Sequence, residues 1–146
     1  MAGMSELDLT LDPERVSFID GFAGGDYDPR SMNKDYKIIK ALAEKGMRIA
    51  VCGKTAGSYS REWVLWEGME LTKHIDDEEK VLSMMTSEPA RMLGIDDMTG
   101  SIEVGKRADL VVWSMNPLSD FRARVLKTML AGKVVYQEGD EIKCYC

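Results

Sequence analysis

The loop Gly53-Lys54-Thr55 holds the residue types with the clearest chemical potential, because a glycine, a lysine and a hydroxyl residue after an apolar strand are typical of phosphate-binding loops. That motif requires a further glycine five residues before Gly53, and the residue there is Arg48, inside the expected strand. No loop then separates the strand from Gly53, so the backbone amides cannot surround a phosphate. A nucleotide site is not predicted.

Side chains that could bind a metal ion or act as nucleophiles are few. His74 is the single histidine and lies among charged residues, so we expect it to be solvated rather than a metal ligand. Three cysteines without an export signal indicate free thiols, and Cys144 and Cys146 are too close in sequence for a zinc knuckle. We assign no catalytic, cofactor-binding or metal-binding residue in this chain.

Composition argues against several classes of protein. The chain has 146 residues, of which 45% are hydrophobic, enough for a folded core. The net charge of −6 and the mixing of both signs argue against a nucleic-acid partner and against binding to an anionic membrane. No apolar run is long enough to span a bilayer, and residues 1–11 lack the pattern of a signal peptide. A cytoplasmic location is therefore expected.

The elements that must position any site alternate between helix and strand in the first part of the chain. Apolar spacing predicts a helix over 33–45, stopped by Gly46, and then a short buried strand over 47–52. Helix, glycine and buried strand are typical of an α/β layer with parallel strands. Residues 1–31 are rich in turn formers, and only the short run 16–19 could be a strand.

Three more helices are expected before residue 95. The first begins near Ser60 and ends about His74, the second is capped by Asp76 and Asp77, and the third runs from Pro89 to the stop at Gly94. After residue 95 the residue pattern predicts strands instead of helices, over 108–113, 125–130 and 133–136, with a tight hairpin at Ala131-Gly132. Asp109 begins the first of these strands, and we expect it to accept hydrogen bonds rather than perform chemistry.

Two stretches carry a family resemblance. The run Met85-Thr86-Ser87-Glu88-Pro89-Ala90-Arg91-Met92-Leu93-Gly94-Ile95 resembles the last helical segment of amidohydrolase-superfamily barrels of the imidazolonepropionase-like branch. The run Gly100-Ser101-Ile102-Glu103-Val104-Gly105-Lys106-Arg107-Ala108-Asp109-Leu110-Val111-Val112 is similar to that family's exit into a small β-sandwich. Asn116-Pro117-Leu118 and the hairpin 125–136 continue the resemblance, which spans about residues 33–139 and is strongest over 84–136.

The resemblance implies a partial fold. The strand 47–52 would correspond to the eighth strand of the barrel and the helix 33–45 to the seventh, whereas a complete barrel takes about 250 residues. The expected fold class is therefore α+β, a partial (β/α) barrel segment followed by a small β-sandwich-like unit. We divide the chain into residues 1–94, the last βα units of an amidohydrolase-like barrel, and residues 95–146, a C-terminal β unit.

The same resemblance implies a chemistry that the chain lacks. Complete members hold a divalent metal, typically zinc, with a His-x-His pair and further histidines, and an aspartate after the eighth strand takes a proton from the metal-bound water. Here Gly53-Lys54-Thr55 follows that strand, and no acid occurs until Glu62. The chain by itself is thus expected to lack the activity of the family, the hydrolysis of carbon–nitrogen bonds other than peptide bonds.

Two hypotheses remain open. In the first, the chain is a fragment or subunit of an amidohydrolase-like hydrolase and completes a barrel supplied by a complementary chain. This hypothesis is favoured by strand 47–52, which has no expected parallel neighbour within the chain. The side chains of Met84, Met85 and Met92 suit either an adaptable contact surface or the core. In the second, it is a non-catalytic interaction module or decayed remnant that forms a homo-oligomer. Trp63 and Trp66, on one helix face, would then form a dimer patch instead of packing on a barrel.

Overall fold

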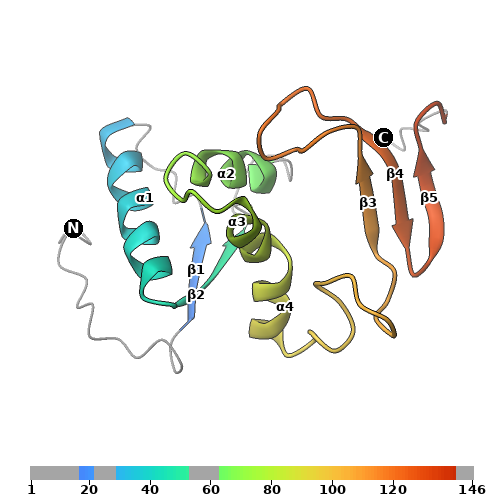
Figure 1. Ribbon diagram of the computed structural model, residues 1–146, viewed down its shortest axis with the longest axis horizontal. Coiled ribbons are helices and arrows are strands. Elements are labelled where there is room, and N and C mark those ends of the chain that lie inside the picture. The colour runs from blue at the N-terminus through green and yellow to red at the C-terminus, as the bar shows by residue number, and fades with distance from the viewer. Residues whose placement is uncertain (1–16, 22–28, 53–62, 141–146) are drawn as a thin grey trace, which may run out of the picture.

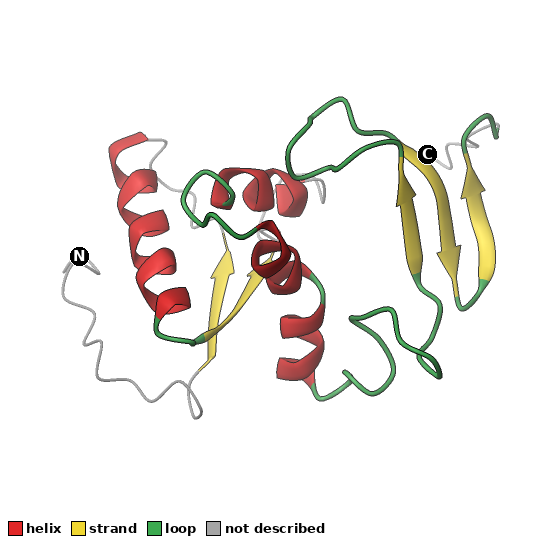
Figure 2. Ribbon diagram, in the orientation of Figure 1, coloured by secondary structure: helices red, strands yellow, loops and turns green. Residues whose placement is uncertain are grey.

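The computed structural model describes residues 17–21, 29–52 and 63–140. Figure 1 shows the described helices gathered around a pair of strands, with an antiparallel sheet to one side of them. Figure 2 shows the same division by secondary structure, with the helices on one side and the antiparallel sheet on the other. The chain therefore combines helices with a small antiparallel sheet, in agreement with the predicted α+β class. The assignments to a barrel segment and to a sandwich stay predictions, as does the division at residue 94.

The first strands form a parallel pair. Strand β1 (Ser17–Gly21) lies alongside β2 (Arg48–Cys52), and helix α1 (Pro29–Glu44) lies between them in sequence. The expectation that strand 47–52 has no parallel neighbour within the chain is wrong. The turn formers around β1 concealed it, because a five-residue strand that includes Ser17, Asp20 and Gly21 carries a weak apolar signal.

Helix α1 packs on β2 through one apolar face. Tyr36, Ile39, Leu42 and Ala43 recur at helical spacing and are buried. Gly46 adopts a φ of 79°, which a glycine accepts without strain, and the Met47 amide then donates to the Leu42 carbonyl at 3.1 Å. The predicted helix, stop and strand are thus confirmed, with helix α1 beginning a few residues earlier than expected.

Three short helices follow. They are α2 (Trp63–Leu71), α3 (Glu78–Met85) and α4 (Ser87–Leu93). The Asp77 carboxylate caps α3 by accepting from the Lys80 amide at 2.9 Å, and Gly94 closes α4 in the left-handed conformation at a φ of 66°. Both caps confirm the prediction, whereas α2 ends at Leu71, before the predicted His74, where the chain turns instead.

The hydrophobic core lies between β2 and the helices. Its buried members share an apolar or aromatic side chain and come from α1, β2, α2, α3, the turns before β2 and α3, and one later loop: Tyr36, Ile39, Leu42, Ala43, Met47, Ile49, Val51, Leu71, Ile75, Val81, Met84 and Leu118. Met84 is buried and Met85 packs against the cluster, so the interpretation of these two methionines as core residues is confirmed. No helix in the described part of the chain is long and apolar enough to cross a membrane.

The C-terminal sheet has the order β3-β4-β5 and is antiparallel throughout. Its strands are β3 (Leu110–Trp113), β4 (Val125–Leu130) and β5 (Lys133–Gln137). Ala131 at a φ of 50° and Gly132 at 78° make the tight turn between β4 and β5, as predicted from that dipeptide.

A loop from the C-terminal part joins the sheet to the helices. Leu118 is buried in the core, and a Cβ added at Gly68 of α2 would lie 2.9 Å from its Cδ2 atom. The Asn116 side chain accepts from the Leu118 amide at 2.9 Å and donates from Nδ2 to the Glu78 carboxylate on α3 at 2.6 Å. Leu118 and Asn116 thus attach the loop that follows β3 to two helices.

Candidate functional site

In parallel β/α folds the active site normally lies at the carboxyl ends of the strands, which here are the ends of β1 and β2. The register pairs Gly21 with Cys52, so the two strands end level with each other, and Asp20 pairs with Val51 one position earlier. The sequence predicted only residues 16–19 as a possible strand, so it did not place Asp20 at this end of the sheet. Lys54 and Thr55, where the family resemblance expects an aspartate, lie outside the described residues, as does the loop tested for phosphate binding.

The described residues do not fit a divalent metal centre. Nowhere in residues 17–21, 29–52 and 63–140 do three or more His, Cys, Asp or Glu residues lie together in a way that could hold a metal ion. A zinc or related site needs three or four such ligands around one point.

His74 has a structural role that the sequence did not indicate. Its imidazole stacks on the ring of Tyr36, with 4.9 Å between ring centroids and 14° between ring planes. The His74 amide donates to the Leu71 carbonyl at 2.9 Å, which fixes the turn after α2. His74 is half-buried, and the expectation that it is not a metal ligand stays a prediction. Tyr36 projects from α1, and no sequence pattern links it to a residue 38 positions away.

Asp109 performs the structural task predicted for it. One carboxylate oxygen accepts from the Ala131 amide at 2.7 Å, and the other accepts from the Arg107 Nε at 2.6 Å. The hydrogen bond from Ala131 and then that from Arg107 lower the pKa of Asp109 below its usual value, because both stabilise the charged form. The side chain ties the start of β3 to the β4–β5 turn.

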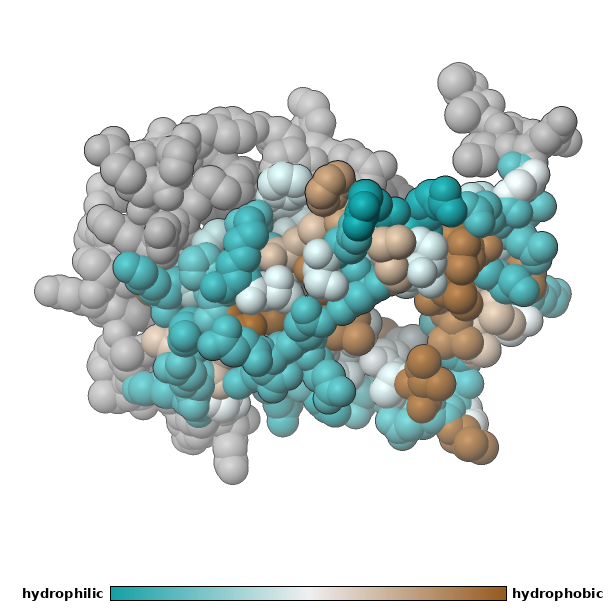
Figure 3. All heavy atoms as spheres, turned by 45° about the horizontal axis from the view of Figure 1, so that its top comes forward, coloured by the Kyte–Doolittle hydropathy of each residue, from teal (hydrophilic) through white to brown (hydrophobic). Residues whose placement is uncertain are grey.

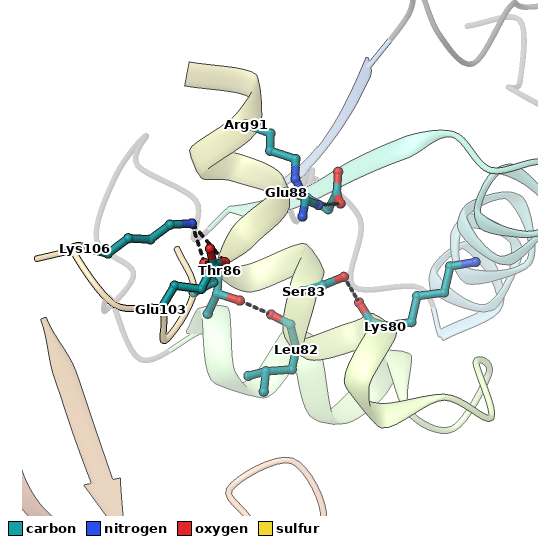
Figure 4. A network of polar contacts seen from close by, with 9 residues as sticks. Lys80, Leu82, Ser83, Thr86, Glu88, Arg91, Glu103 and Lys106 are labelled. Carbon is teal, nitrogen blue, oxygen red and sulfur yellow. Dashed lines mark hydrogen bonds and ion pairs between the residues drawn. The ribbon is translucent and has the colours of Figure 1, made fainter. Parts of the chain in front are cut away.

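A second polar network lies beside α3 and α4 (Figure 4). The Lys106 ammonium donates to the Ser101 hydroxyl at 2.6 Å and to the Glu103 carboxylate at 3.1 Å. The hydrogen bond from Ser101, followed by that from Lys106, lowers the pKa of Glu103. These contacts close the loop after α4, and they bring together no nucleophile, base and acceptor site of the kind that catalysis requires.

Arg91 and Glu88 form an ion pair along α4. The second carboxylate oxygen of Glu88, Oε2, is buried and accepts no hydrogen bond from the described part of the chain. Cys52 ends β2, while Cys144 and Cys146 lie outside the described residues. The described residues therefore supply a scaffold with structural polar contacts and one parallel strand end, and not an assembled active site.

Comparison with known proteins defines the class. A sequence profile of the amidohydrolase family matches residues 30–135. The imidazolonepropionase of Rhizobium meliloti is 35% identical over 89 residues, which make up 60% of this chain and 21% of that enzyme. A 5-methylthioadenosine/S-adenosylhomocysteine deaminase of Desulforudis audaxviator is 56% identical over 36 residues, 25% of this chain and 8% of the deaminase.

A solved structure gives the same result. The amidohydrolase from Thermotoga maritima superimposes with a TM-score of 0.55 at 26% identity, over 72% of this chain and 35% of that one. The chain belongs to the amidohydrolase family, as the segments 85–95 and 100–112 had indicated. It spans about a fifth or less of the length of these two curated relatives. Members of the superfamily are in general metal-dependent hydrolases.

Proposed function

We propose that these residues are the C-terminal part of a metal-dependent hydrolase that cleaves carbon–nitrogen bonds other than peptide bonds, and that they do not catalyse this reaction alone. The observation that carries the proposal is the family match over residues 30–135, in a chain whose described part holds two parallel strands and not a closed barrel. The name of one relative supports the reaction class, since a deaminase breaks a carbon–nitrogen bond.

The β1–β2 pair supports the part of the proposal in which further strands complete the parallel sheet. Parallel strands are normally buried in sheets of several members with helices on their faces. Within residues 17–21, 29–52 and 63–140 the parallel sheet has two strands, each with one unpaired edge among these residues, and the helices beside it enclose an apolar core. Further strands, from a longer polypeptide or from a complementary barrel chain, would pair with these edges and would bring the histidine ligands that the described residues lack.

The test is purification of the tagged chain from its own cells, with the mass and the metal content read on the eluted species. We expect a complex with a barrel segment that carries a His-x-His pair, a stoichiometric divalent metal, and hydrolysis of an amide or imide by the complex. Elution without such a segment and without metal would reject the proposal. The isolated chain is the control, and it should neither retain metal nor hydrolyse the same compound.

A non-catalytic, self-associating module is the second candidate function. It is favoured by the exposure of large apolar side chains, since Trp66 on α2 is 57% exposed and the C-terminal sheet carries further examples. The side chain of Trp63, its predicted partner in a dimer patch, lies outside the described ones. The same purification separates the two candidates, because a module of this kind elutes free of metal whatever its oligomeric state.

A further inference from the structure

We draw no further inference here: the strongest candidate, the apolar surface of the β3–β5 sheet (Figure 3), where Val111, Leu130 and Val135 are exposed, is an unpartnered sheet face, and nothing in the described part of the chain shows what covers it.

Discussion

Replacing Leu118 with alanine removes the apolar side chain that joins the C-terminal loop to the core. Leu118 is 4% exposed and belongs to the core cluster. Truncation of a buried leucine costs about 2–5 kcal/mol, depending on how well the site collapses. Because Leu118 comes from a loop that can move inward, we expect a loss of about 2–3 kcal/mol in the free energy of unfolding.

The position opposite, Gly68, gives the second arm of a double-mutant cycle. An alanine Cβ there would lie 2.5 Å from Met85 Sδ and 2.9 Å from Leu118 Cδ2, so both side chains must shift. Overpacking of this kind costs about 1–3 kcal/mol. Alanine returns about 1 kcal/mol of helix propensity relative to glycine, which leaves a net cost of about 0–2 kcal/mol. With Leu118 truncated, one of the two obstructions disappears and Gly68→Ala should cost less.

The assay is urea unfolding of the wild type, both single variants and the double variant, followed by circular dichroism. We expect the double variant to be more stable than additivity predicts by about 0.5–1 kcal/mol. Additivity within about 0.3 kcal/mol would refute the contact between Leu118 and Gly68. Leu93→Ala is the control, since Leu93 is 73% exposed and its truncation should change stability by less than about 0.5 kcal/mol.

Three further outcomes are expected from single changes. Lys80→Met should cost about 1 kcal/mol in urea unfolding, because Lys80 Nζ donates to the Ala43 carbonyl at 2.6 Å near the end of α1 and the methionine keeps only the apolar stem. Gly94→Ala should also cost about 1 kcal/mol, from the left-handed φ of 66° alone, since no atom lies within 4 Å of the added Cβ; an equally stable variant would contradict this cap. The Arg122 side chain and then its amide lower the pKa of Asp120 to about 2, so its stabilising contribution is present above about pH 4 and is lost as the pH falls toward 2. NMR titration should locate that pKa, and Asp120→Asn should reduce the loss of stability over the same pH range.

Local signals were predicted correctly because they depend on a few neighbouring residues. The Asp77 cap, the Gly94 stop and the Ala131-Gly132 turn each follow from backbone preferences that the sequence displays directly. The hydrogen bonds of Asp109 followed from its place at the start of a predicted strand. The family resemblance over residues 84–136 rests on the same stretch of well-marked caps and turns.

Features that depend on distant residues were not predicted. The pairing of β1 with β2 joins segments separated by a whole helix, and the β1 sequence gives a weak apolar signal. The stacking of His74 on Tyr36 and the insertion of Leu118 beside Gly68 require tertiary contacts that periodicity does not encode. Asn116-Pro117 entered the sequence analysis only through the family resemblance, although Asn116 also bonds Glu78 on α3. The sequence offers few candidate site residues because a metal site of this family needs several histidines and the chain has one.

The Ala131-Gly132 turn has a kinetic consequence. Strands β4 and β5 are joined by two residues, so this hairpin can form within about 1–10 μs, whereas β1 and β2 must close a connection that contains all of α1. The sheet should therefore acquire its hairpin before the parallel pair closes, and during synthesis the β1–α1–β2 segment leaves the ribosome first without it. Folding then proceeds in two regions at different rates, and burial of Leu118 is the event that reports their joining.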